Sequence, residues 1–326
     1  MKLYSFFTDW FVIRGLEYLK FNVKSDNYHT DITLNVLDMY NKNGAMVKEF
    51  NIFGARSKTL YLKSTGYYIK NKHENKKKQL YNIDLEKCLY KEQSNNNYFN
   101  STVYLTEKAK AGGTSFNKSI KVLKKDSDAS QHIELLFLIT KFRLELVTEV
   151  FVVNFILNNL SKDIEVFVGE NAFEQRKNHG SSHEFGYWLN YILDFNDLCN
   201  NIKLKNAICS YFEELHLIFV KTKMFYHDVV GKDKSLINVS GVILIAKAFF
   251  RYSLITKDFR FANAGMFLID FVKQLQINSK GFIQNTFPIH KGNSRYKFPS
   301  WTINYFLEVL ILKKQVLNEF KNCLIN

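Results

Sequence analysis

Cysteine is scarce in this sequence, and the few that occur are not spaced as metal ligands. No Cys-x-x-Cys pair is present in the 326 residues, and the four cysteines are scattered as Cys88, Cys199, Cys209 and Cys323. Small disulfide-built folds and structural zinc sites depend on close or paired cysteines. The pattern therefore argues against a disulfide-built fold and fits a reducing compartment.

Long uncharged apolar runs are missing as well. Residues 1–9 contain one lysine and then an acidic residue, without the apolar run of a secretory signal. The most apolar stretch, residues 135–157, is interrupted by four charged residues between Lys141 and Glu149, which are costly in lipid. We therefore expect a buried helix in this stretch, no transmembrane segment and a cytoplasmic location.

Residues 109–119 contain Gly-Gly-Thr-Ser but are not a phosphate loop. A spaced second glycine followed by Lys-Ser or Lys-Thr, which a phosphate loop requires, is absent. The small and polar residues of the segment predict a flexible connector instead. We expect no cofactor.

Negative charge is in deficit, and the deficit is uneven. The net charge is +14, with 22 basic and 12 acidic residues in 1–127 but 23 and 19 in 128–326. A positive excess of this kind suits an acidic partner, such as an anionic glycan, a nucleic acid or an anionic membrane surface. The alternative is that the charge only keeps the protein soluble.

Short alternating segments with turn signals predict an antiparallel β-sandwich in residues 1–127. The turn at residues 41–44 contains Asn-Gly, and the densest basic run is the charged loop at 71–78. Regularly spaced short strands of this kind are typical of sandwiches. The predicted strands are residues 11–23, 32–37, 46–53, 59–62, 67–69, 80–85 and 98–105.

Two of these segments resemble carbohydrate-binding β-sandwich modules. The resemblance rests on Ile-Thr-Leu-Asn-Val-Leu-Asp-Met-Tyr-Asn-Lys-Asn-Gly at 32–44 and on Lys-Thr-Leu-Tyr-Leu-Lys-Ser-Thr-Gly-Tyr-Tyr-Ile at 58–69. It implies that Tyr61, Tyr67 and Tyr68 form a face on which sugar rings stack. The competing interpretation places half of these rings in the core, because alternate residues of a strand point inward.

The rhythm of apolar residues changes to a helical period near residue 128. Residues 128–326 therefore predict a second domain of α/α-hairpins, so that the expected fold class is α+β. The predicted helices are residues 131–159, 189–198, 204–220, 239–252, 261–275 and 301–320.

A polar corner at residues 170–191 lies between these helices and holds the best site candidates. Ser181 to Glu184 fit a capping box, so Glu184 is explained equally well as a helix-start residue. His179 and His183 are four residues apart, as two metal ligands on a helix are, but no third ligand is evident. We therefore predict no metal site.

This half of the chain resembles the helical toroids of polysaccharide lyases and uronyl C5-epimerases. The resemblance covers about residues 180–318 and rests on the hairpin at 240–264 and on Tyr-Lys-Phe-Pro-Ser-Trp-Thr-Ile-Asn-Tyr-Phe at 296–306. Asn178-His179-Gly180 is similar to the Asn-His-Gly segment of alginate lyases and heparinase-type enzymes. The toroid implied is a partial one, since complete toroids have more helices.

The resemblance implies catalytic roles for Asn178 and His179, which would meet the uronate carboxylate. A tyrosine on a later helix would move protons; Asn238 stands where such a tyrosine is expected, which leaves Tyr226 or Tyr187. Neutralising the carboxylate makes the C5 proton of a uronate acidic enough to remove, and lyases and C5-epimerases share that step. Substrate-binding roles are predicted for Arg176, His183, Trp188, Arg251, Tyr61 and Tyr68.

The leading hypothesis is a carbohydrate-active protein that acts on an anionic, uronate-containing polysaccharide by C5 proton abstraction. The alternative is a non-catalytic module that binds a glycan or a partner protein in cell-surface polysaccharide assembly, such as that of a capsule. A third hypothesis, nucleic-acid binding, is permitted by the charge but supported by no recognition motif.

Overall fold

The computed structural model describes residues 24–42, 45–51, 149–165, 181–199, 201–291 and 296–325. Helices dominate this part of the chain: α2 (Asp26–Tyr40), α7 (Glu149–Leu160), α9 (Ser181–Leu198), α10 (Ile202–Thr222), α11 (Val239–Thr256), α12 (Phe259–Asn278) and α13 (Ser300–Ile325). The described strands form three antiparallel pairs: β1 (Asn41–Lys42) with β2 (Ala45–Met46), β3 (Glu49–Asn51) with β6 (Lys297–Pro299), and β4 (Ile237–Asn238) with β5 (Thr286–Phe287).

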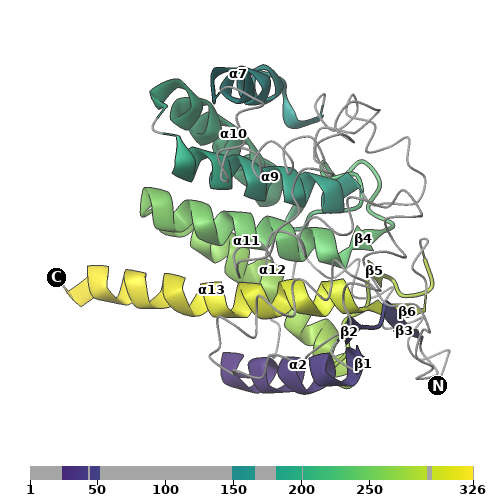
Figure 1. Ribbon diagram of the computed structural model, residues 1–326. Helices are drawn as coiled ribbons and strands as arrows, with labels where there is room; N and C mark the ends of the chain where they lie inside the picture. Colours follow the sequence, from purple (N-terminus) through teal and green to yellow (C-terminus); the bar gives the residue numbers. More distant parts are fainter. Residues whose placement is uncertain are drawn as a thin grey trace.

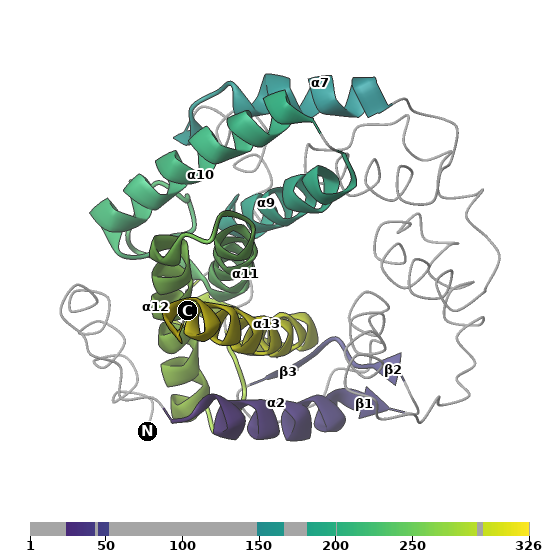
Figure 2. The same ribbon diagram turned by 90° about the vertical axis from the view of Figure 1, so that its left-hand side faces the viewer.

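Helices α9, α11 and α13 lie side by side and run in the same direction (Figure 1). The Asn190 side chain of α9 donates to the Leu244 carbonyl of α11, and Lys247 of α11 pairs with Glu308 of α13. Helices α10 and α12 run in the opposite sense and cross them obliquely, and α2 likewise crosses α13, with Tyr40 near Phe298 and Asp26 near Lys313 (Figure 2). Helices α9, α11 and α13, which we call the inner helices, therefore bring their amino ends to one side of the molecule, next to β4, β5 and β6.

Polar side chains define where the helices begin. Asn201 caps α10, Asn238 caps α11 and Asp258 caps α12, each by accepting hydrogen bonds from backbone N–H groups of the first turn. Helices α10 and α11 end at Lys223 and Lys257, both in the left-handed conformation with φ of 57°.

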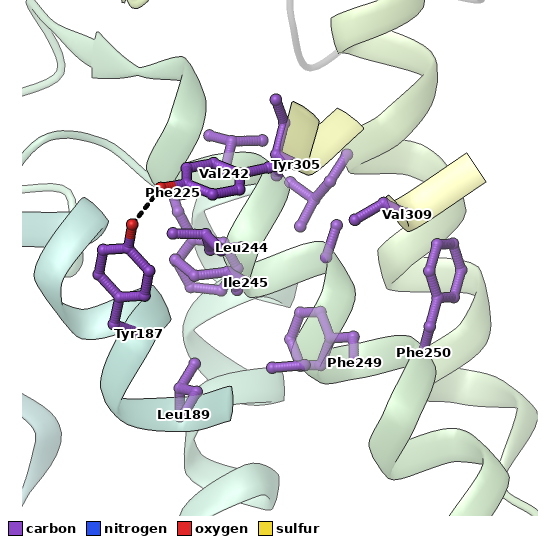
Figure 3. Packing of buried hydrophobic residues seen from close by; sticks show 14 of the residues in the cluster. Tyr187, Leu189, Phe225, Val242, Leu244, Ile245, Phe249, Phe250, Tyr305 and Val309 are labelled. Carbon is purple, nitrogen blue, oxygen red and sulfur yellow. Dashed lines mark hydrogen bonds between the residues drawn. The ribbon is translucent and has the colours of Figure 1, made fainter. Parts of the chain in front are cut away.

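Helix α11 is the centre of the core. Almost every side chain from Val239 to Ser253 is buried by the neighbouring helices, and Figure 3 shows Val242, Leu244 and Ile245 among aromatic side chains from the surrounding elements. Among the described helices it alone is long and apolar enough to cross a membrane, but 72% of it is buried inside the protein. A core helix of a globular protein passes the same length and composition test.

Two glycines allow α9 and α11 to approach closely. A methyl group at Gly241 would lie 2.7 Å from the Ser182 carbonyl carbon and 2.8 Å from the His183 nitrogen. A methyl group at Gly186 would lie 2.5 Å from the Leu244 Cβ. Any larger residue would therefore push the two helices apart at their amino ends.

The helices predicted from residue 189 onward are confirmed. Each of the predicted ranges 189–198, 204–220, 239–252, 261–275 and 301–320 lies inside a helix of the structure. For the predicted helix at 131–159, the structure describes only the part from residue 149, which is helical.

The prediction of an N-terminal β-sandwich is wrong, because the described residues form no sandwich and the segment predicted as a strand at 32–37 belongs to α2. Alternation over six residues suggested a strand. Over a longer window the buried residues recur with the period of a helix, at His29, Thr33, Val36, Leu37 and Tyr40. That face packs on α12 and α13, and burial against them decides in favour of the helix.

The docking of α2 includes four charged side chains, which we call the charge cluster: Asp26, Asp270, Lys273 and Lys313. Lys273 is 2% exposed and pairs with both Asp26 and Asp270. Lys313 Nζ lies 3.2 Å from Asp26 Oδ1. The cluster therefore ties α2 to α12 and α13 through buried charges.

Of the remaining predictions for the front half, some fall on described residues and the others fall outside them. The β1–β2 pairing on either side of residues 43–44 agrees with the predicted turn, but β3 pairs with β6 ahead of α13 rather than continuing that hairpin. The predicted strands at 11–23, 59–62, 67–69, 80–85 and 98–105 lie outside the described residues, as does the domain boundary at 127/128.

Candidate functional site

A group of hydrogen-bonded polar side chains lies where the amino ends of α9, α11 and α13 meet. We call this group the polar cluster: His183 and Tyr187 from α9, Asn238 at the end of β4, Ser240 from α11, Asn285 before β5, and Thr302 and Tyr305 from α13. All except the half-buried His183 are buried. Hydrogen-bonding groups withdrawn from water in this way hold fixed positions, since each depends on its partner.

A chain of hydrogen bonds links the three helices through the cluster. The His183 Nδ1 and the Ser240 Oγ are 2.8 Å apart. The Ser240 Oγ also lies 2.8 Å from the Asn238 Oδ1 and 2.8 Å from the Asn285 Oδ1. Thr302 reaches the same Asn285 Oδ1 at 3.1 Å, so the chain runs from α9 through α11 to α13.

Two tyrosine hydroxyls meet at the inner side of the cluster. Tyr187 of α9 and Tyr305 of α13 point their hydroxyl groups at each other and form a hydrogen bond (Figure 3). The Tyr187 ring meets the His183 ring edge-on at 4.9 Å and stacks on the Tyr191 ring at 6.1 Å. A phenol, an imidazole and a second phenol are thus in contact, and these are groups that take up and release protons.

The position of the cluster also favours negative charge. Helices α9, α11 and α13 all direct their amino ends toward it, and each amino end carries a partial positive charge. This partial charge favours an anionic group placed beside the first turns of these helices, and the effect fades beyond the first turn.

Tyr226 and His227 lie next to the start of α9 but outside the cluster. The Ser182 N–H donates to the His227 carbonyl, so the segment before β4 runs beside the first turn of α9. The Tyr226 side chain is buried against Gly231. Burial lowers the pKa of His227, although the nearby carboxylates of Asp228 and Asp233 act in the opposite direction.

Trp188 and Arg251, both predicted to bind substrate, have other surroundings. Trp188 is completely buried, and its ring packs edge-on against Phe155. Arg251 lies about 16 Å along α11 from Ser240, given the helical rise per residue. Its guanidinium donates to the Asn190 carbonyl and pairs with Asp194 at 2.7 Å and Asp197 at 3.1 Å. The structure therefore brings together His183 and Tyr187, but not Trp188, Tyr226 or Arg251.

The other predicted site residues lie outside the described residues. They are Arg176, Asn178 and His179, which precede α9 in the sequence, and Tyr61 and Tyr68 of the front half. Their roles stay predictions.

Five members of the cluster were not among the predicted site residues: Asn238, Ser240, Asn285, Thr302 and Tyr305. Tyr305 stands in the aromatic segment 296–306 that carries the toroid resemblance, so a signal for it existed. Asn238 was noted only as the absence of a tyrosine. Ser240 and Asn285 had no signal, because their role depends on neighbours 57 and 45 positions away.

A cavity of about 130 Å³ lies at the opposite ends of the inner helices. It is lined by the last turns of α9 and α11 and the first turns of α10, including Leu193, Ile208, Cys209 and Tyr252. Within the described ranges, no three His, Cys, Asp or Glu side chains come together as a metal site.

Comparison of the chain with protein-family models, with curated proteins and with solved structures gave no match. The polar cluster is therefore interpreted from its own geometry.

Proposed function

We propose that this protein acts on a uronate-containing polysaccharide by removing the proton at C5 of the uronate, with the polar cluster as its active site. The observation that carries the proposal is the pair of tyrosine hydroxyls, Tyr187 and Tyr305, beside His183 at the amino ends of three parallel helices. C5 abstraction requires a proton acceptor next to a place where negative charge is stabilised.

In the proposed reaction, Tyr187 takes the C5 proton as a phenolate. The Tyr305 hydroxyl donates a hydrogen bond to that phenolate, and a hydrogen bond to a charged form favours it. The helix amino ends stabilise the enolate that develops on the substrate carboxylate. Asn178 and His179, which precede α9, are assigned the direct contact with that carboxylate.

The C5 carbanion then has two outcomes. In a lyase, the bond from C4 to its oxygen breaks, a C4–C5 double bond forms, and a proton is delivered to the leaving oxygen. In an epimerase, a proton returns to C5 from the opposite face. The Tyr305 hydroxyl touches that of Tyr187 and so lies on the same side of the substrate, which suits proton delivery to the leaving oxygen in a lyase; an epimerase needs a further donor on the opposite face.

Replacement of Tyr187 by phenylalanine tests the proposal. We expect Tyr187→Phe to reduce turnover by at least roughly a hundredfold, because it removes the group that accepts the proton. Turnover is followed by ultraviolet absorbance of the unsaturated product on alginate, heparosan and chondroitin, and by exchange of the C5 proton in heavy water.

Tyr252→Phe is the matched control. It removes the same hydroxyl from a buried tyrosine at the other end of the inner helices and is expected to leave the rate unchanged. Equal rates for Tyr187→Phe and the wild type would overturn the assignment of the base. If the wild-type protein neither cleaves any of the three polymers nor exchanges their C5 protons, but binds a column that carries one of them, the protein is a binding module instead.

A further inference from the structure

The hydroxyl of Ser240 has more neighbours than it has protons. Its oxygen lies 2.8 Å from the His183 Nδ1, from the Asn238 Oδ1 and from the Asn285 Oδ1. A serine hydroxyl donates one hydrogen bond and accepts two. The three contacts therefore cannot all be hydrogen bonds unless at least one neighbour donates.

The orientation of Asn238 is fixed. Its Oδ1 accepts the Gly241 N–H at 3.0 Å, so an oxygen and not the amide nitrogen faces Ser240. Asn238 is therefore an acceptor, and the Ser240 hydroxyl donates its proton to the Asn238 Oδ1.

The proton count then assigns the role of His183. If the His183 Nδ1 is an acceptor, it competes with Asn238 for the single Ser240 proton, and one of these two contacts is not a hydrogen bond. If the His183 Nδ1 carries a proton and donates it to Ser240, both contacts are hydrogen bonds. The result is the same for either orientation of the Asn285 amide. When Asn285 presents its nitrogen, all three contacts are hydrogen bonds, as buried polar groups require.

We infer that Ser240, itself held by Asn238, is a positioning residue that fixes the neutral His183 ring in the tautomer protonated at Nδ1. The lone pair of the ring is then on Nε2, so Nε2 is the nitrogen that takes up a proton. The tautomer itself does not depend on the proposed function, but its catalytic role rests on it. In that role His183 is a proton acceptor next to Tyr187, whose ring it contacts.

Nitrogen-15 NMR of the labelled full-length protein tests the inference without any substrate. The signal of His183 is assigned by its loss in a His183→Asn variant. We expect the two-bond correlations at neutral pH to show a protonated Nδ1 and an unprotonated Nε2. The reverse pattern in the wild-type protein would overturn the inference, whatever the variants do.

Two serine variants sharpen the test. Ser240→Ala removes the acceptor of the Nδ1 proton, so we expect the form protonated at Nε2 to become the major one. Ser253→Ala is the control, since Ser253 is also completely buried on α11 and donates only to the Phe250 carbonyl. An unchanged tautomer in a folded Ser240→Ala protein would contradict the role of Ser240.

Activity provides a separate readout. With a substrate in hand, Ser240→Ala is expected to lower kcat on the order of tenfold with little change in KM. Because the tautomer is measured on the free protein, absence of turnover would count against the proposed function and leave the inference about His183 standing.

Discussion

The polar cluster and the charge cluster are both largely withdrawn from water, but they are built from different groups. The polar cluster joins three parallel helices through hydroxyls, amides and an imidazole. The charge cluster joins α2 to α12 and α13 through two lysines and two aspartates. One is made of hydroxyl, amide and imidazole groups, and the other of carboxylates and ammonium groups.

The difference indicates what each cluster does. Buried ion pairs are costly to break because a lone charge is left without water, so they fix one docking geometry. Neutral hydrogen-bonded groups cost less to leave without a partner, and they allow a proton to move between neighbours. The charge cluster therefore serves to place α2, whereas the polar cluster is suited to chemistry.

Breaking the charge cluster is expected to have the largest effect on stability. Asp26→Asn removes the carboxylate shared by Lys273 and Lys313 and leaves Asp270 as their acidic partner in the cluster. We expect the free energy of unfolding to fall by about 3 kcal/mol, the lower end for a broken buried pair, because Asp26 is partly exposed. Urea unfolding measures the change.

Asp31→Asn is the control for that prediction. It removes the same charge from an exposed position on the same helix and is expected to change the free energy of unfolding by less than about 0.5 kcal/mol. Equal effects of the two variants would show that the charge cluster does not hold α2 in place.

Separating the helices beneath the polar cluster is expected to have an intermediate effect. Gly241→Ala places a methyl group against the backbone of Ser182 and His183, which cannot move aside as a side chain does. We expect a loss of about 1–3 kcal/mol of unfolding free energy, the usual cost of overpacking, together with lower turnover. Thermal unfolding and the polymer assays measure the two effects.

Gly265→Ala separates the two effects. It adds the same methyl group between α12 and the Phe250 ring of α11, away from the cluster. It is expected to lower stability and to leave turnover per folded molecule unchanged. Equal loss of turnover in both variants would mean that the position of His183 depends on the whole core and not on the α9–α11 contact.

Acid is expected to act gradually on the region around the charge cluster. Burial alone raises the pKa of Asp26, but the hydrogen bond from Lys273 and the charges of Lys313 and Lys273 outweigh it and hold this pKa below its ordinary value. The unfolded chain then binds protons more readily than the folded one. The stability from Asp26 is therefore present above about pH 4 and is lost as the pH falls through the lowered pKa.

His29 adds a second, earlier step. Its side chain is completely buried with Nδ1 bonded to Gln276, and burial lowers its pKa despite that hydrogen bond. Stability is therefore expected to begin falling below about pH 6.5, the pKa of an unfolded histidine. Urea midpoints across this range measure both steps, and a flat profile down to pH 4 would contradict the role given to His29.

Sequence pattern was sufficient for the helices of the second half. The helical period of apolar residues lies within single segments, so it predicted α10 and α12 to within a few residues. It failed at α2, where six alternating residues suggested a strand. The buried face that makes α2 a helix is completed by Gln276 and Lys273, almost 250 positions away.

The site was predicted only in part, because some of its residues share one segment and the others come from distant segments. His183 and Tyr187 lie on one short segment, and their spacing of four residues predicts a shared helix face. Their partners Ser240 and Tyr305 are 57 and 118 positions away. Arg251 had a suitable side chain, but it lies at the carboxyl end of α11, away from Ser240, where it pairs with Asp194 and Asp197 of α9.

Sequence by itself determined that residues 181–325 form successive helices, because apolar periods act within a few turns, although the helix predicted at 189–198 begins earlier, at Ser181. Only the tertiary structure decided that α2 is a helix and that a second tyrosine meets Tyr187. Both outcomes depend on burial against distant segments, and no local pattern carries the identity of a neighbour that folding alone brings into contact.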